Sequence, residues 1–442
     1  MKSLLNWLAL AAVLTTPGVT AAEGPYTAHE WGTFTSVQAA DGRPLEWNPL
    51  TVAELPDFVH DLTEASPTNR RGHLRLLAAK TAFRTLQRME TPVIYFRSEA
   101  PVEVDVEVRF PQGIVTEWYP QARPVPRRAD ELPRRDRIHW DHVRVLSPAH
   151  PAVFRQDSGG SHYYAARAAE ANPLEVVRAG SAPEQEKFVF YRGVGNFEAP
   201  LKVVTADHAR SLQLFNPGRR ALGALWVFQL RDGRGAIQRL EALNGGHSRE
   251  VRLTSDRQWK PQAELQSEIS RGLQEDLVRQ GLTESEAGAM VSTWTDSWFA
   301  EPGVRVLYLL PSAWVDEILP LRLQPPPREL VRVFVGRAEV LSPAVEFGLL
   351  RQLLRYSDGD EAARAEAVQS VRSLGLGRFA EVAVRHVVSS VPPNPQFSNH
   401  AWALLETLSK PSVDSPEIVR GNPPAASLTS TARSGASASS RP

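Results

Sequence analysis

The chain has 442 residues, with 50 basic and 50 acidic side chains, so its formal net charge is zero and its pI is about 7.2. A balanced chain lacks the long-range positive field that gathers nucleic acid, and we expect no nucleic-acid partner. The chain has no cysteine, which excludes disulfides and a lipidated N-terminal cysteine. Its length favours two or three domains.

The N-terminus has the three parts of a cleavable secretory signal. Lys2 is followed by an apolar run over residues 4–14 and by the small residues of the Val19-Thr20-Ala21-Ala22 stretch. The run is too short to cross a bilayer, which takes roughly 20 residues. We expect a signal peptide over residues 1–22, cleaved after Ala21 or Ala22, and no membrane span in the mature chain. An exported chain without cysteine is typical of a bacterial periplasmic or extracellular protein.

Residues 23–255 are predicted to form a β-rich sandwich region. Residues 102–110 alternate apolar and charged side chains, as a strand with one buried face does. Residues 92–96 and 114–119 lie on either side, and the three segments predict an antiparallel meander. Short strands separated by turns then run from Phe188 to Leu253, with a hairpin loop over residues 231–235, Arg231-Asp232-Gly233-Arg234-Gly235.

This second set of strands resembles bacterial immunoglobulin-like adhesion modules of the CARDB kind. The resemblance rests on "LFNPG", "LWVFQLRDG" and "LEALNGGHSREVRL" within residues 188–253. It implies an immunoglobulin-like β-sandwich that binds or spaces other parts and does not carry out chemistry itself.

Helical periodicity begins near Lys260. We expect an α+β segment over residues 256–340, in which Thr283 and Glu286 have the spacing of a capping box. A helical domain of HEAT-like pairs is predicted over residues 341–410. Residues 411–442 contain mainly Ser, Ala, Thr, Pro and Gly and are predicted to be disordered.

His29 and Glu30 are the catalytic candidates. An imidazole beside a carboxylate can relay a proton or ligate a metal. The zinc-protease helix requires a second histidine four residues after the first, and Thr33 stands there instead. The alternative is structural packing of this aromatic-rich segment.

The ligand-binding candidates are His162, Tyr163, Arg167 and Arg192. Guanidinium groups bind carboxylates and phosphates through two parallel hydrogen bonds, and tyrosine rings pack on sugars. The alternative for residues 161–167 is a strand or turn with an exposed polar face. His139 and His142 would share a face on a helix but not on a strand, and their neighbours favour a strand. We therefore assign no metal site, and no motif identifies a cofactor.

Over residues 27–340 the chain resembles a group of uncharacterised exported bacterial proteins. The resemblance rests on "HEWGTFTS", "METPVIYF", "FPQGIVTEWYP", "SHYYAAR" and "FYRGVGNF". It implies export and no particular activity. The leading hypothesis is an exported, non-catalytic envelope or secreted protein that binds a polar ligand or protein partner through a β-sandwich core. The alternative is a periplasmic or secreted hydrolase of envelope polymers. In it, His29 and Glu30 act either as the catalytic base or as ligands of a metal ion.

Overall fold

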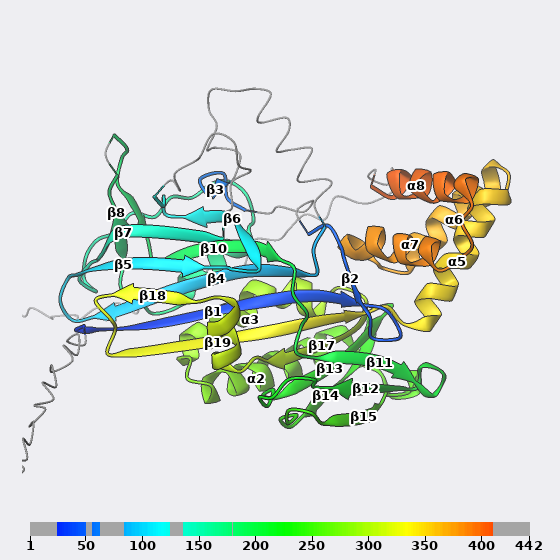
Figure 1. Cartoon of the computed structure of the whole chain (residues 1–442), viewed down its shortest axis with the longest axis horizontal. Coiled ribbons are helices and arrows are strands. Elements are labelled where there is room, and N and C mark those ends of the chain that lie inside the picture. The colour runs from blue at the N-terminus through cyan, green and yellow to red at the C-terminus, as the bar shows by residue number, and fades with distance from the viewer. Residues whose placement is uncertain (1–23, 50–54, 62–83, 124–135, 179, 410–442) are drawn as a thin grey trace, which may run out of the picture.

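The computed structural model describes residues 24–49, 55–61, 84–123, 136–178 and 180–409. Within them the chain is rich in strands and ends in a group of helices (Figure 1). The expected signal peptide and C-terminal tail lie outside the described residues. No described helix is long and apolar enough to cross a bilayer.

A long mixed sheet forms the middle of the protein. Its strand order is β16-β14-β13-β17-β19-β1-β4-β10-β6-β3, with β2 paired to β1. The central strands β1 and β19 run parallel, and every other pair described in this sheet is antiparallel. The strands are β1 (Tyr26–Gln38), β2 (Pro44–Leu45), β3 (His60–Asp61), β4 (Gln87–Ser98), β6 (Gly113–Tyr119), β10 (Phe188–Gly195), β13 (Leu225–Arg231), β14 (Arg234–Leu240), β16 (Lys260–Pro261), β17 (Gly303–Leu309) and β19 (Glu329–Val340).

Two smaller sheets cover one face of the long sheet. One has the order β18-β5-β7-β8-β9 and the other β11-β12-β15. Their apolar side chains share a single core with those of the long sheet, so the sheets pack face to face. The strands are β5 (Val102–Arg109), β7 (Arg137–Val145), β8 (Leu174–Val176), β9 (Glu184–Glu186), β11 (Lys202–Ala206), β12 (Ser211–Phe215), β15 (Ser248–Arg252) and β18 (Leu321–Gln324).

Helices cover the opposite face of the long sheet and enclose a second core. They are α2 (Gln262–Arg279), α3 (Glu284–Phe299) and the 3-10 helix η1 (His162–Ala168). The predicted capping box at the start of α3 is confirmed, because Thr283 and Glu286 each bond the other's backbone N–H. Short helices η2 (Asp207–Ala209), η3 (Asp256–Gln258) and α4 (Ser312–Ile318) connect strands.

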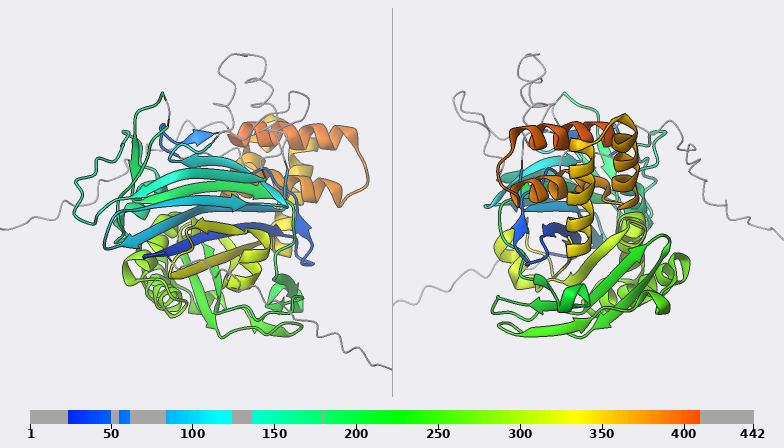
Figure 2. Two further views of the ribbon diagram at one scale, coloured as in Figure 1. Left: turned by 60° about the vertical axis from the view of Figure 1, so that its left-hand side comes forward. Right: turned by 90° about the vertical axis from the view of Figure 1, so that its right-hand side faces the viewer.

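The C-terminal helices form a third core at one end of the long sheet, as two further views show (Figure 2). They pack on Val37 at the end of β1, on Leu341 after β19, and on Trp47, whose ring lies 5.3 Å from that of Phe379. The elements are α5 (Pro343–Asp358), α6 (Glu361–Ser373), η4 (Gly377–Phe379), α7 (Ala380–Ser389) and α8 (Pro395–Ser409).

The predicted meander is wrong. The strands themselves form, but β5 pairs with β7 and β18 in the five-stranded sheet, whereas β4 and β6 both pair with β10 in the long sheet. The burial patterns give the reason: β5 buries only one face, while β4 is buried on both faces and so belongs in the middle of a covered sheet.

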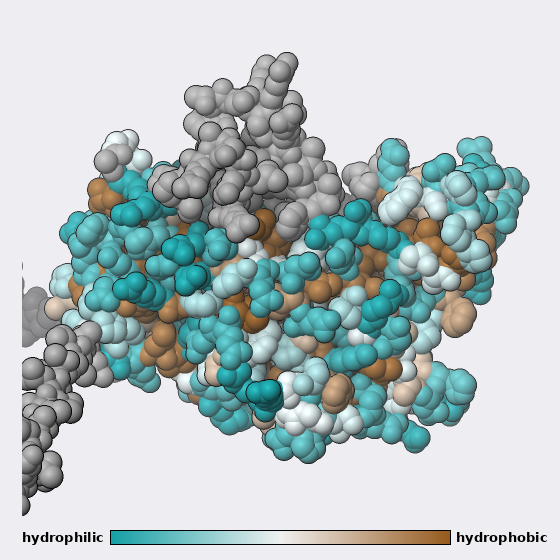
Figure 3. Space-filling view, in the orientation of Figure 1, coloured by the Kyte–Doolittle hydropathy of each residue, from teal (hydrophilic) through white to brown (hydrophobic). Residues whose placement is uncertain are grey.

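The strands predicted between Phe188 and Leu253 are present but divide between two sheets. β10, β13 and β14 lie in the long sheet, and β11, β12 and β15 form the three-stranded one. The hairpin loop is confirmed but is shorter than predicted: Arg231 pairs with Arg234, and the turn consists of Asp232 and Gly233, with φ of 54° and 69°. On the face shown in Figure 3, polar side chains predominate and apolar ones are scattered among them.

Candidate functional site

A row of buried charged side chains crosses the long sheet on its helix-covered face. On the strands this charged row consists of Glu117, Arg192, Arg88, Glu90, Arg337, Glu339 and Arg305. Adjacent strands place its members side by side: Glu117 of β6 faces Arg192 of β10, and Thr35 of β1 faces both Arg88 of β4 and Arg337 of β19. None of the seven charged side chains belongs to a residue more than 7% exposed. Members of the row contact both the second and the third core: Arg305 lies over the ring of Phe228 and Arg337 over that of Phe379.

At one end of the row, carboxylates and guanidinium groups bond in closely fitted pairs. Arg192 donates to both oxygens of Glu117, from Nε at 2.8 Å and from Nη2 at 3.1 Å. Glu90 accepts from Thr35 Oγ1 at 3.1 Å, and its Oε1 lies 3.4 Å from Nε of Arg88. Bidentate geometry of this kind is the strongest form of arginine–carboxylate pairing.

At the other end, Glu339 lies between two fully buried arginines. Its Oε2 accepts from Nη2 of Arg337 at 2.8 Å and lies 3.2 Å from Nε of Arg305. Arg305 also donates to backbone carbonyls, including that of Trp298 at 2.6 Å. Because the last turn of an α-helix leaves carbonyl groups unpaired, these bonds satisfy the end of α3.

Two residues from outside the sheet complete the charged row. Glu301, just after α3, accepts from Nη2 of Arg337 at 2.6 Å, and Arg378 of η4 donates to Glu90 at 2.5 Å. Arg378 also lies over the ring of Phe379, 4.9 Å from its centroid. Their side chains are 32% and 12% exposed respectively, so the row reaches solvent beside η4.

The arginines lower the pKa of three carboxyl groups of the row, those of Glu90, Glu117 and Glu301. Burial alone would raise the pKa of Glu90, but Arg378 and the other nearby guanidinium groups outweigh burial and lower that pKa to about 2. The pKa of Glu117 is lowered in the same way by Arg192, and that of Glu301 is lowered by arginines, both against burial. These carboxyl groups carry no proton at neutral pH and are unsuited to general acid catalysis.

Among the described residues the charged row carries an excess of positive charge. It contains the arginines 88, 192, 305, 337 and 378 and the glutamates 90, 117, 301 and 339, which is five against four. Burial and the charge of Arg192 lower the pKa of Arg88 to about 10. The cationic form of Arg88 is thus held at an electrostatic cost, which is a feature of ligand sites.

His29 and Glu30, the catalytic candidates, are buried on opposite faces of β1. His29 pairs with Glu286 of α3, with Nδ1 2.9 Å from Oε2. Glu30 accepts from Nε of Arg332 at 2.6 Å on the other face and also bonds the hydroxyl of Tyr191. Because successive side chains of a strand point in opposite directions, the structure does not bring the two candidates together.

His162, Tyr163 and Arg167 lie together on η1, whereas Arg192 belongs to the charged row. Tyr163 and Arg167 both bond the buried Glu186, at 2.9 Å and at 2.6 Å. The ring of His162 stacks on Trp294, with centroids 6.4 Å apart. The four ligand-binding candidates therefore divide between two clusters, and the η1 segment is a 3-10 helix, neither strand nor simple turn.

Sequence reasoning found only Arg192 among the members of the charged row. The other members lie one or two at a time on four strands, after α3 and in η4, and no local motif joins all of them. One signal was available: Arg88 and Glu90 come shortly before the apolar run of residues 92–96 in the same strand, and a buried charge needs partners. The partners themselves come from segments up to 288 residues away, as for Glu90 and Arg378.

Comparisons with known proteins give no family. No protein-family model and no curated protein matches the chain. Among solved structures, "Yeast delta-COP-I mu-homology domain complexed with Dsl1 WxWxV peptide" aligns over 72% of this chain and 99% of its own, with a TM-score of 0.28 and 6% identity. "Yeast delta-COP-I mu-homology domain" aligns over the same shares, with a TM-score of 0.27 and 5% identity. Similarity this low carries no argument about fold or function.

Proposed function

We propose that this protein is an exported bacterial envelope or secreted protein that binds an anionic ligand at the charged row and performs no catalysis there. The observation that carries the proposal is the gathering of five guanidinium groups, among the described residues, in a buried row that reaches solvent beside η4. Arginine is the side chain best suited to hold a carboxylate or phosphate group, so the row offers the chemistry that an anionic ligand needs.

The lowered pKa values of Glu90 and Glu117 favour binding over catalysis, because neither group is poised to exchange a proton near neutral pH. In this proposal the packed sheets provide a scaffold of the immunoglobulin-like kind, and the HEAT-like helical end makes protein contacts. The separation of His29 from Glu30 leaves the hydrolase alternative without a supporting observation.

Isothermal titration of the purified protein with inorganic phosphate and with citrate tests the proposal. We expect saturable binding of at least one probe, weakened at least about tenfold in Arg88→Gln, which is the change expected from about 1.4 kcal/mol. Arg144→Gln, which removes an arginine 56% exposed on β7, is the control and should bind like the wild type. Absence of binding to both probes, or equal binding by all three proteins, would rule the proposal out. Mass spectrometry of the protein from cell fractions tests export and loss of residues 1–22.

A further inference from the structure

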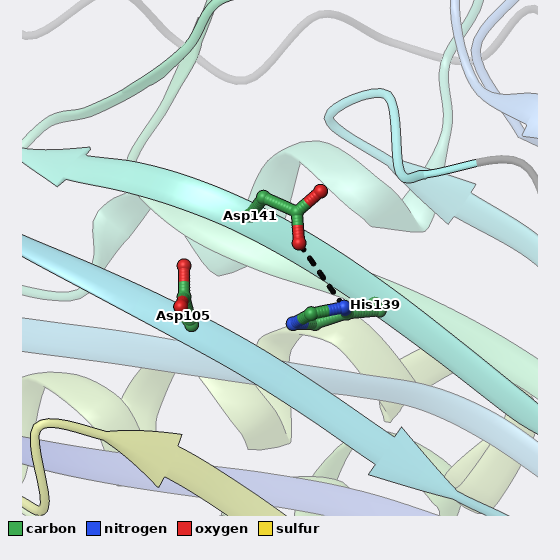
Figure 4. Close-up of side chains that lie close together, drawn as sticks. All are labelled: Asp105, His139 and Asp141. Carbon is green, nitrogen blue, oxygen red and sulfur yellow. Dashed lines mark ion pairs between the residues drawn. The ribbon is translucent and has the colours of Figure 1, made fainter.

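A second group of polar side chains lies on the outer face of the five-stranded sheet. His139 and Asp141 stand on β7, and Asp105 stands on the neighbouring strand β5 (Figure 4). One possible ligand atom from each lies within 4.8 Å of the other two. Nδ1 of His139 and Oδ1 of Asp141 are already 3.1 Å apart. All three residues are partly buried, so the group is neither sealed in the core nor spread over open surface.

A β-bulge brings Asp105 into this group. The register between β5 and β7 shifts after Val104, so that Asp105 alone faces both Asp141 and His142. The backbone N–H of His142, whose φ is 54°, donates to Oδ1 of Asp105 at 2.9 Å. The bulge and this hydrogen bond orient the carboxylate toward β7.

An outer partner orients the second carboxylate. Nε of Arg123 donates to Oδ2 of Asp141 at 2.6 Å, which leaves Oδ1 as the oxygen turned toward His139. The side chain of Arg123 is 58% exposed. Polar partners that hold a ligand oxygen or ring in place are a regular feature of metal sites.

We propose that Asp105, His139 and Asp141 bind one divalent transition-metal ion, such as Zn²⁺. Imidazole nitrogen and carboxylate oxygen are both ligands of such ions, with bonds about 2.0–2.2 Å long. Ligand atoms around such an ion lie about 3 Å apart, so small rotations of side chains on a rigid sheet complete the site. Solvent takes the remaining positions, because the side chain of His139 is 31% exposed. The site differs from the His139–His142 pair considered from sequence, since His142 pairs with Glu103 instead.

The test uses the whole protein after dialysis against a chelator, titrated with Zn²⁺ alone in a calorimeter. We expect one strongly bound ion per chain, with affinity at least about tenfold lower in Asp105→Asn and in His139→Gln. Glu103→Gln is the matched control, because it removes a carboxylate 56% exposed on the same face of β5, and it should bind like the wild type.

Stability measurements separate lost binding from lost folding. Zn²⁺ should raise the unfolding temperature of the wild type and of Glu103→Gln but not that of the two ligand variants. With Co²⁺ in place of Zn²⁺, the visible absorption of the bound ion should change in His139→Gln. A wild-type protein that neither binds nor is stabilised by Zn²⁺, or ligand variants that match Glu103→Gln, would overturn the proposal. The charged row lies on another sheet, so these outcomes are independent of anion binding.

Discussion

Glu90 is the residue on which the charged row most depends. It bonds Thr35 and Arg378, lies beside Arg88, and is 2% exposed. Glu90→Gln keeps the shape but leaves the guanidinium groups without their shared anion, and we expect a loss of about 3–5 kcal/mol in the free energy of unfolding, measured by urea titration. Glu317→Gln breaks an exposed ion pair and should change the free energy of unfolding far less. Similar losses in both variants would contradict this role.

The lowered pKa of Glu90 makes its contribution depend on pH. Its pKa falls from the ordinary 4.5 to about 2 in the folded protein, because the arginines outweigh burial. A group with a depressed folded pKa contributes its full stability above about pH 4.5 and loses it as the pH falls toward about 2. Urea titrations at stepped pH should therefore show a shallower acid loss in Glu90→Gln than in the wild type. Parallel slopes would show that the carboxylate is not held in this way.

At the scale of elements, the start of α3 is a junction between the helix and two strands. Glu286 closes the capping box with Thr283 and also bonds His29 of β1 and Arg97 of β4. Its carboxylate thus caps the N-terminus of α3 and also bonds side chains of the sheet.

Thr283→Ala should lower the free energy of unfolding by about 1 kcal/mol, because only the cap is lost. Glu286→Gln should cost more, about 3 kcal/mol, because Arg97 then lies beside an uncharged amide and His29 loses the paired carboxylate. Thr295→Ala on the same helix, which removes only a bond to the carbonyl of Val291, is the control. The interpretation of Glu286 as a junction fails if Thr283→Ala proves the costlier change in urea titrations.

Local patterns predicted the elements well but not their neighbours. The spacing of Thr283 and Glu286 is a local signal, and the alternation in β5 identified a strand. Neither pattern says which strand lies alongside, so the meander was wrong. The charged row could not be predicted from sequence either, because its members are far apart in the chain. Arg378, for example, bonds Glu90 across a separation of 288 residues.

At the scale of the whole molecule, the helical end and the sheet are joined by contacts of Phe379. Phe379 lies in the third core against Trp47, and Arg337 and Arg378 of the charged row stack over its ring. Phe379 therefore contacts both the C-terminal helices and the charged row of the sheet.

Phe379→Ala should lower the free energy of unfolding by about 3–5 kcal/mol, because it leaves a cavity between helices and sheet. Loss of helical circular dichroism and the change in tryptophan fluorescence should still coincide in one transition. Wild-type unfolding in two separate steps, helices first, would show that the two parts are independent.

The parallel pairing of β1 with β19 determines the order of events when the chain is made. Every residue of β1 is buried, and its partners on β19 stand 302 residues later, as for Glu30 and Arg332. A ribosome delivers β1 first and β19 only after most of the chain has been synthesised. β1 can pair early with β4, but its other edge stays unpaired until β19 has been made. Contacts of such long sequence separation make folding slow and leave the growing chain dependent on protection from aggregation.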